Sequence, residues 1–188
     1  PEFLQQKLRP KKGVIVEVPS DAHQFAIAVP KFQNERERLL FQAEKPVYAE
    51  TDGKVVGEHQ GAHYFTIGQR KGLNVGGTKE PLFVIDTDVD KNIIYTGQGK
   101  SHPGLLRNTL FIKEDELHWV RPDLALDVDG KMEVMARIRY RQPLQPATLY
   151  KVENGLFVDF KEKQSAITEG QFAAWYVEDE LIGSGVIS

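Results

Sequence analysis

The chain of 188 residues contains no cysteine, which excludes disulfide bonds, thiolate metal sites and thiol nucleophiles. A protein without cysteine fits a cytoplasmic location. No apolar run approaches the length that crosses a bilayer, and the N-terminus lacks the charged and then apolar pattern of a signal peptide. We therefore expect no membrane association. The content of 40% hydrophobic and 27% charged residues is typical of a folded protein with one core or two small ones.

Motifs for nucleotide binding and catalysis are also missing. The sequence has no glycine-rich phosphate loop that ends in Lys-Ser or Lys-Thr, and it has no nucleophile elbow. Asp86, Asp88 and Asp90 alternate as in a calcium loop. However, Lys91 and Gly97 occupy the two places where that loop requires glycine and glutamate. We interpret this segment as a solvated hairpin turn.

His59 and His63 are four residues apart, the spacing of two metal ligands on one face of a helix. Gly57 and Gly61 disfavour a helix here, so we interpret both as loop histidines that pack or form hydrogen bonds locally. A self-sufficient hydrolase built around these histidines would lack a nucleophile and a complete metal-ligand set. We predict no catalytic residue, no metal site and no cofactor in this chain.

The first part of the chain predicts a small α+β domain over residues 1–104. An amphipathic piece at Glu2–Leu8 opens in the middle of an element, which suggests a piece of a longer protein. A helix is predicted within Gln33–Glu44, where apolar residues recur at helical spacing and Pro46 ends the pattern. Strands are predicted at Val14–Val18, Lys54–Gly57, Tyr64–Ile67, Leu82–Asp86 and Ile93–Thr96, with a hairpin turn at Asp88–Lys91.

Residues 105–188 predict a small antiparallel β-barrel, with a domain boundary at His102-Pro103-Gly104. Asn154-Gly155 and Glu178-Asp179 are tight-turn sequences that predict two hairpins. Many short strands at close spacing indicate a barrel or a sandwich, and we favour the barrel. The predicted strands are Thr109–Ile112, Leu117–Val120, Met132–Tyr140, Ala147–Val152, Leu156–Phe160, Phe172–Val177 and Leu181–Val186. The fold class is therefore mainly β with some α.

Two stretches are candidates for phosphate binding. Glycines surround the triplet Gln69-Arg70-Lys71, and they would let backbone N–H groups approach an anion beside two positive charges. A tight connection with exposed or internally paired basic side chains explains the triplet equally well.

The second stretch runs from Lys131 to Lys151 and has a net charge of +4, from five basic residues and one acidic residue, in a chain of net charge −3. Period-two alternation directs Met132 and Tyr140 to a core, together with the three apolar residues between them. Arg137, Arg139 and Arg141 then share the other face at intervals of ~6–7 Å, close to the spacing of phosphates on RNA. An ordinary solvated strand face is the alternative.

These stretches resemble the tRNA-specific 2-thiouridylase family, from about Phe3 to the C-terminus. The resemblance rests on Gly57-Glu-His-Gln-Gly61 and on the run Tyr64-Phe-Thr-Ile-Gly-Gln-Arg-Lys-Gly-Leu73. Further matches are Glu80-Pro81, Gly97-Gln98-Gly99, His102-Pro103, Leu117-His118-Trp119, Arg139-Tyr140-Arg141-Gln142 and Thr168-x-Gly170-Gln171.

The resemblance implies an enzyme whose N-terminal ATP-pyrophosphatase domain uses ATP and Mg²⁺ to adenylate the wobble uridine of tRNAs for Lys, Glu and Gln. Two cysteines of that domain relay sulfur, which a donor protein supplies, to carbon 2 of the base. A central domain and a C-terminal β-barrel reminiscent of translation-factor barrels hold the tRNA. This chain has neither the nucleotide-binding loop nor the cysteines, so we expect it to be inactive alone.

The resemblance also assigns individual residues. The tRNA contacts of the barrel fall on Arg139 and Tyr140, with a further contact at Gln171, so Tyr140 would be reached at a strand end. The segment of about residues 19–51 is longer than the family pattern and reads as a helical insertion in the central domain. A different class of function, a free-standing barrel that binds protein through the apolar loop after Gly72, remains open. Salt-dependent binding of tRNA would distinguish the first function from the second.

Overall fold

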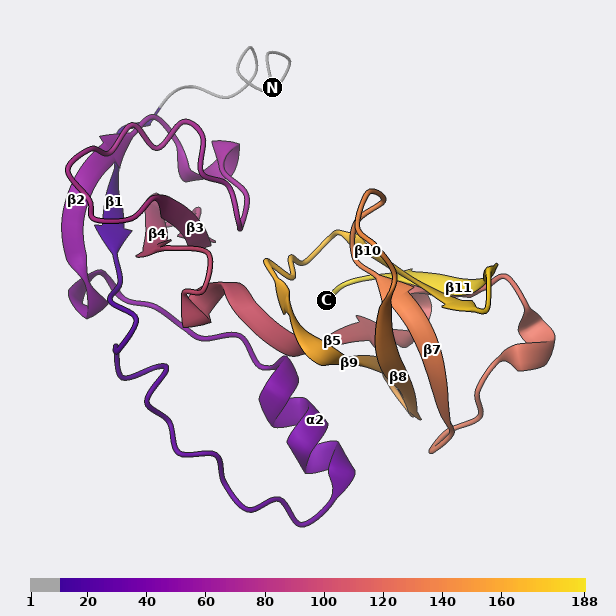
Figure 1. The fold of residues 1–188 in the computed structure, drawn as a ribbon. Coiled ribbons are helices and arrows are strands. Elements are labelled where there is room, and N and C mark those ends of the chain that lie inside the picture. Colours follow the sequence, from indigo (N-terminus) through magenta and orange to yellow (C-terminus); the bar gives the residue numbers. More distant parts are fainter. Residues whose placement is uncertain (1–10) are drawn as a thin grey trace. The chain divides into compact units, whose positions relative to one another are not determined.

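A computed structural model describes residues 11–188 (Figure 1), and the segment expected at Glu2–Leu8 lies outside the described residues. The backbone divides into two compact units. The first comprises the described residues up to Val29 together with Pro46–Leu106, and the second comprises Pro30–Lys45 together with Arg107–Ser188. The chain therefore passes from one unit to the other three times.

The first unit contains a mixed four-stranded sheet. Its strands are β1 (Gly13–Glu17), β2 (Lys54–His59), β3 (Leu82–Asp88) and β4 (Ile93–Gln98), in the order β2-β1-β4-β3. β1 pairs parallel with β4, whereas the other pairs are antiparallel, and the predicted hairpin joins β3 to β4. Alternation along the strands buries Ile15, Val84 and Ile94 in a common core. Three short 3-10 helices complete the unit, η1 (Glu50–Asp52), η2 (Ala62–Tyr64) and η3 (Pro103–Leu105).

Four of the five strands predicted for this part of the chain are confirmed, but the strand predicted at Tyr64–Ile67 is wrong. Gly61 has a φ of 148°, in the region that favours glycine, and it turns the backbone into η2. The Phe65 N–H then donates to the Ala62 carbonyl over 3.0 Å, so the chain is curled where an extended segment was expected. The chain rejoins the sheet at Gly68, whose N–H donates to the Val84 carbonyl over 2.7 Å.

The second unit contains seven strands in the order β5-β9-β8-β7-β10-β11-β6. From β9 to β6 all neighbouring pairs are antiparallel. The two predicted hairpins are confirmed, since Val152 pairs with Gly155 and Val177 pairs with Glu180. The elements are β5 (Leu106–Lys113), η4 (Glu114–Glu116), β6 (Leu117–Trp119), η5 (Pro122–Leu124), β7 (Lys131–Arg137), β8 (Gln145–Val152), β9 (Gly155–Ser165), β10 (Phe172–Val177) and β11 (Glu180–Val186).

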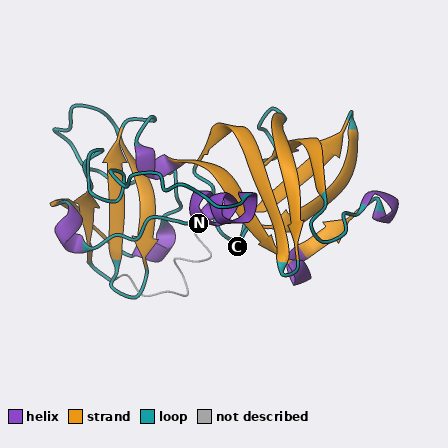
Figure 2. Cartoon of the chain, turned by 90° about the horizontal axis from the view of Figure 1, so that it is seen from below, coloured by secondary structure: helices purple, strands orange, loops and turns teal. Residues whose placement is uncertain are grey.

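This sheet curls around its own core as a half-barrel (Figure 2), which confirms the predicted barrel in an open form. β5 and β6 are its two edge strands. At the C-terminus, the Ser188 N–H donates to the Phe111 carbonyl of β5 over 3.0 Å. Inward-facing residues fill the interior, where the rings of Trp119 and Trp175 meet edge to face with centroids 5.6 Å apart.

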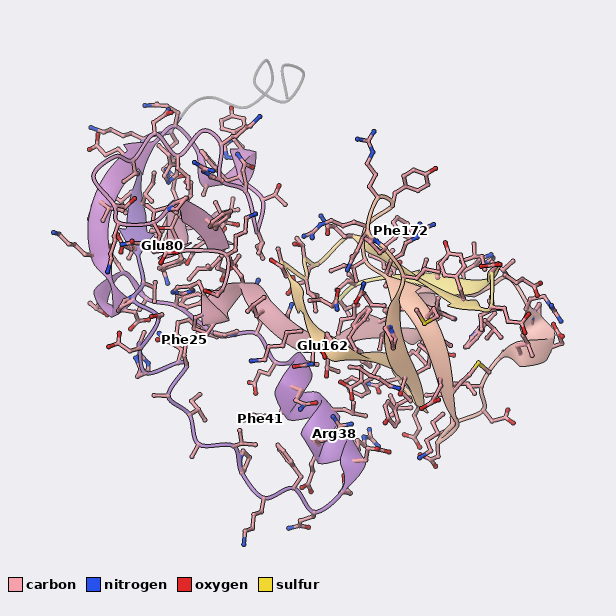
Figure 3. All side chains as sticks on the ribbon, viewed as in Figure 1. Phe25, Arg38, Phe41, Glu80, Glu162 and Phe172 are labelled. Carbon is pink, nitrogen blue, oxygen red and sulfur yellow. The ribbon has the colours of Figure 1, made fainter. Side chains whose placement is uncertain are left out.

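Helix α2 (Glu35–Ala43) confirms the helix predicted within Gln33–Glu44. Asn34 caps its N-terminus, since the side-chain oxygen accepts the Glu37 N–H over 2.9 Å. The helix belongs to the second unit, where Leu39 packs with Val152 and Phe157. The Arg38 guanidinium of this helix (Figure 3) lies 2.9 Å from the Asp159 carboxylate of β9. No helix within residues 11–188 is both long enough and apolar enough to span a membrane.

The buried and exposed leucines of α2 make a matched test of this packing. Leu39 is 2% exposed and Leu40 is 54% exposed. Leu39→Ala should lower the free energy of unfolding of the second unit by about 2–4 kcal/mol, because it removes buried methyl groups and leaves a cavity. Leu40→Ala should change it by less than about 0.5 kcal/mol. Both tryptophans of the chain lie in this unit, so urea unfolding followed by tryptophan fluorescence measures it selectively. Equal losses in the two variants would contradict the packing.

Candidate functional site

The predicted arginine row is interrupted, because β7 ends at Arg137 and not at Tyr140. Beyond Arg137 the chain bends into the turn that leads to β8. The side-chain oxygen of Gln142 accepts the Ile138 N–H over 3.3 Å, and the Gln142 N–H donates to the Arg139 carbonyl over 3.1 Å. These local bonds replace the cross-strand ladder. Alternation predicted that Arg137, Arg139 and Arg141 project from one face of a strand. That prediction is wrong, because only Arg137 lies in β7.

Arg137 is half-buried and is held by two tyrosines. Its guanidinium lies 5.5 Å from the ring centroid of Tyr140 and 5.1 Å from that of Tyr176. It also donates to the Tyr140 carbonyl over 3.0 Å and to the Tyr176 hydroxyl over 2.7 Å. Through these two hydrogen bonds and two cation–π contacts, Arg137 braces the turn.

Tyr140 projects from the turn and is 85% exposed. Period-two alternation placed this ring in the core, and that prediction is wrong because the strand stops three residues earlier. The family resemblance implied instead an accessible residue at a strand end, and the structure agrees with that geometry. Ile138, from the same predicted core face, remains buried at 2% exposure.

Arg139 and Arg141 differ in their surroundings although both are exposed. The Arg139 guanidinium donates to the Ser165 carbonyl over 3.2 Å and to the Ala166 carbonyl over 2.8 Å. Ala166 has a φ of 56°, which an L residue adopts only when its surroundings hold it there. Arg141 forms no side-chain hydrogen bond or ion pair with the described residues. Its guanidinium is therefore available to an outside anion.

Gln171 lies between Gly170, which has a φ of 79°, and the start of β10. Its carbonyl accepts the Ile187 N–H over 2.8 Å, which fixes the backbone beside the C-terminus. Its side-chain oxygen is buried and has no partner among the described residues. Gln171 directly precedes β10, and β10 pairs with the end of β7 that leads into the β7–β8 turn.

Gln69, Arg70 and Lys71 lie in the first unit. The Gln69 side chain accepts the Thr66 N–H over 3.2 Å and donates to the Lys71 carbonyl over 2.8 Å, so it shapes the loop. The side chains of Arg70 and Lys71 are exposed. Arg70 also borders an open pocket of about 370 Å³. This arrangement is compatible with both predictions for the triplet, an anion site and an exposed connection.

The apolar loop after Gly72 is partly buried in its own unit. Leu73 is 4% exposed and belongs to the core of the first unit, and Val75 packs against the same core. A neighbouring open pocket of about 740 Å³ is lined by both carboxylates and ammonium groups, among them Glu17, Asp52 and Lys79. Its mixed charge favours no single class of ligand.

His59 is a structural residue. It is 5% exposed, and its Nδ1 accepts the Gly61 N–H over 2.9 Å, so the ring proton lies on Nε2, 3.2 Å from the Asn92 carbonyl. Burial lowers the pKa of His59 below its ordinary value. The local hydrogen bonding predicted for this histidine is confirmed. His63 packs against Tyr64, with ring centroids 4.0 Å apart and ring planes tilted by 55°.

His102 repeats the bonding pattern of His59. Its Nδ1 accepts the Gly104 N–H over 3.2 Å, and its Nε2 lies 3.1 Å from the Val18 carbonyl. Burial also lowers the pKa of His102. Each neutral ring thus ties a turn to a distant backbone carbonyl of the first unit. Among residues 11–188 no cluster of three or more histidine or carboxylate side chains could hold a metal ion.

The acidic hairpin turn between β3 and β4 is closed by one of its own carboxylates. Asp88 Oδ1 accepts the Lys91 N–H over 2.8 Å, and this bond lowers the pKa of Asp88. The Lys91 ammonium lies 3.3 Å from the same carboxylate. The interpretation of this segment as a solvated turn is confirmed.

Two residues that shape the β7–β8 turn, Tyr176 and Gln142, were not predicted as site residues from the sequence. Tyr176 bonds to Arg137 from 39 positions away, and no local pattern marks such a partner. Gln142 accepts the N–H of Ile138, only four positions earlier, so its contact is local in sequence. Gln142 also donates to the side-chain oxygen of the buried Gln164, which ties the turn to β9.

Two known domain families match this chain. A tRNA methyl transferase PRC-barrel domain matches residues 37–98, and an aminomethyltransferase beta-barrel domain matches residues 109–187. The class of protein is therefore a PRC-barrel domain followed by an aminomethyltransferase-type barrel, in agreement with the mixed sheet and the half-barrel. Residues 1–36 lie outside both matches.

Curated relatives extend this result. The chain is 62% identical over all 188 residues to the tRNA-specific 2-thiouridylase MnmA of Christiangramia forsetii, and 59% identical over the same length to that of Flavobacterium johnsoniae. It is 47% identical over 186 residues to that of Karelsulcia muelleri. The chain belongs to the tRNA-specific 2-thiouridylase family, of which it represents the central and C-terminal domains. It spans about half the length of these relatives, 48%, 48% and 46% respectively.

The two buried histidines predict how stability depends on pH. Their pKa values are lower in the folded chain than the ordinary value of 6.5, so the unfolded chain binds more protons as the pH falls below about 6.5. The free energy of unfolding of the first unit should be greatest above pH 6.5. It should decrease below that pH until the folded-state pKa values are passed.

Hydrogen exchange of β1 and β4, measured by mass spectrometry at several pH values, would follow this change. The double variant His59→Gln/His102→Gln should flatten the dependence. His118→Gln, which changes an exposed histidine, should preserve it. A dependence that persists unchanged in the double variant would assign the effect to other groups.

Proposed function

We propose that this chain is the tRNA-binding portion of a tRNA 2-thiouridylase, which installs 2-thiouridine at the wobble position of tRNA. The chemistry, ATP-dependent adenylation followed by sulfur transfer, belongs to an N-terminal ATP-pyrophosphatase domain that uses ATP and Mg²⁺. The partners of the chain are tRNAs for Lys, Glu and Gln, that N-terminal domain, and a protein that donates sulfur. The cytoplasm is the proposed location.

The observation that carries this proposal is the identity of 62% and 59% over the entire chain with two tRNA-specific 2-thiouridylases. The β7–β8 turn supplies a physical reason for binding RNA. It exposes Tyr140 together with Arg139 and Arg141, and residues 134–152 contain no carboxylate. An exposed aromatic ring beside cations suits nucleotides, because the ring stacks on bases and the cations attract phosphates.

The proposed tRNA contacts are Arg139, Tyr140 and Gln171, with Arg141 as a phosphate ligand. Arg137 supports the turn that presents them, because its guanidinium is occupied by Tyr140 and Tyr176. The Gln69-Arg70-Lys71 loop of the first unit is a second, separate candidate for phosphate or interdomain contact.

The proposed domains are a central domain at residues 1–104 and a tRNA-binding barrel at residues 105–188, with an insertion at about residues 19–51. The matches over residues 37–98 and 109–187 support this division. The helix of the insertion is α2, which is attached to the half-barrel through Arg38 and Asp159.

Replacing Arg141 is the cleanest test of tRNA binding, because its side chain has no internal partner in the described structure. Arg141→Ala should weaken binding of any tRNA and make the dependence of log affinity on log salt shallower by about one unit. Its melting temperature should stay unchanged. Lys131→Ala removes an equal charge at the other end of β7, about 20 Å away, and should leave tRNA binding unchanged. Filter binding at several salt concentrations measures these effects.

Arg139→Ala extends the same experiment. It should weaken tRNA binding and also lower the free energy of unfolding by about 0.5–1 kcal/mol, because the bonds to two carbonyl groups are lost. If both arginine variants bind tRNA with unchanged affinity, the β7–β8 turn is not the RNA-binding surface. The Gln69-Arg70-Lys71 loop would then be the next candidate.

The chain alone should have no ATP-dependent activity, because its sequence contains neither a phosphate loop to bind the nucleotide nor a cysteine to carry sulfur. We expect no release of pyrophosphate or phosphate above the buffer background, with or without tRNA. A full-length relative assayed in parallel is the positive control. ATP turnover that follows the chain through several chromatographic steps would refute this assignment.

A further inference from the structure

Phe172 is the most exposed phenylalanine recorded in the second unit, with 65% of its surface accessible (Figure 3). It begins β10, in which Ala173 and Trp175 face the core and are 0% exposed. Alternation therefore directs Phe172, Ala174 and Tyr176 to the outer face of the half-barrel. Packing in the described structure leaves most of the ring of Phe172 in contact with solvent.

The outer face around Phe172 is continuous with the candidate site. Ala174 pairs with Arg137 of β7, so Arg137 lies on the strand next to Phe172, and Tyr176, which bonds to Arg137, lies on the same strand as Phe172. Gln171, a proposed tRNA contact, is its immediate neighbour in the chain. On the other side Phe172 pairs with Val186, and Ala174 pairs with Ser184, so the adjacent outward positions carry small side chains.

The chemistry of the Phe172 ring limits which partner would gain from covering it. The ring has no polar group, so a flat or apolar partner that covered it would remove apolar surface from water. Arg139 and Arg141 are exposed in the neighbouring β7–β8 turn, and residues 134–152 contain no carboxylate, whereas Glu169 lies three positions before Phe172. An apolar protein segment would gain little from these cations, whereas a nucleotide offers a flat base to the ring and a phosphate to the arginines.

We propose that Phe172 stacks on an unpaired base of the bound tRNA. This inference rests on the proposed function and adds to it a contact with a base, beside contacts with the backbone. Aromatic stacking is tolerant of sequence, because every base has a π-face, so Phe172 contributes affinity without selecting one nucleotide.

Four variants test the stacking. Phe172→Ala and Phe172→Leu should each weaken tRNA binding by roughly tenfold, because leucine keeps the apolar volume but not the flat ring. Phe172→Trp should bind as tightly as the original chain. Leu40→Ala, which trims another exposed apolar residue of the same unit, should leave binding unchanged. Fluorescence anisotropy with labelled tRNA measures all four affinities.

The tryptophan variant adds a direct readout. Both native tryptophans are in the second unit, where Trp175 is buried and Trp119 packs against the core. The additional fluorescence of Phe172→Trp should therefore report on the surface. Unpaired tRNA loops should quench it by stacking, whereas heparin, a polyanion without bases, should not.

The possible results separate the two proposals. If the unaltered chain binds no tRNA, the proposed function itself fails. If it binds tRNA and Phe172→Ala binds equally well, tRNA binding stands and stacking is refuted. If Phe172→Leu keeps full affinity while Phe172→Ala loses it, the residue makes an apolar contact with no stacking, which also overturns the inference.

Discussion

The guanidinium of Arg137 joins two strands and a turn, and the geometry of the candidate site depends on it. Its donors lie in the plane of the group and bond to the Tyr140 carbonyl and the Tyr176 hydroxyl. Its central carbon also lies 5.5 Å and 5.1 Å from the ring centroids of Tyr140 and Tyr176, and a lysine could not combine these contacts with two hydrogen bonds from a planar group. Tyr140 can therefore stand 85% exposed while the backbone beneath it is fixed. A ring held in this way loses less conformational entropy when it binds a partner.

Three arginines at intervals of two residues have three different environments, because β7 ends within the series. Arg137 is still in the strand and is enclosed by aromatic rings. Arg139 lies in the turn and holds the carbonyls of Ser165 and Ala166. Arg141 extends into solvent. A cluster of positive charge in the sequence thus indicates which segment is a candidate for binding phosphate. The position at which the strand ends determines which of its arginine side chains are free to contact a phosphate.

Much of the fold was predictable because its signals are local. The tight turn at Asn154-Gly155 and the period-two burial around Trp175 depend on residues close together in sequence. The failures at Tyr64–Ile67 and beyond Arg137 came from backbone reversal at Gly61 and from the side chain of Gln142. The parallel pairing of β1 with β4 carries no local signature either.

The candidate site was less predictable from residue patterns than the fold. Arg139, Tyr140 and Gln171 were assigned by family resemblance, and alternation alone would have buried Tyr140. The pairing of Arg137 with Tyr176 spans 39 positions and becomes visible only in the folded sheet. Sequence patterns identify which segments carry charge or aromatic rings. Long-range contacts determine whether those groups face one another or the solvent.

The position of α2 has a consequence for how the chain is made on the ribosome. Its Arg38 and the Asp159 that it pairs with are separated by 121 positions, and its other partners in β8 and β9 are also synthesised late. At typical rates of translation, the ribosome takes roughly 6–24 s to synthesise the residues between Arg38 and Asp159. A helix of nine residues is only marginally stable in water without its packing partners. The apolar face around Leu39 must therefore wait, uncovered, until the late strands of the half-barrel have emerged.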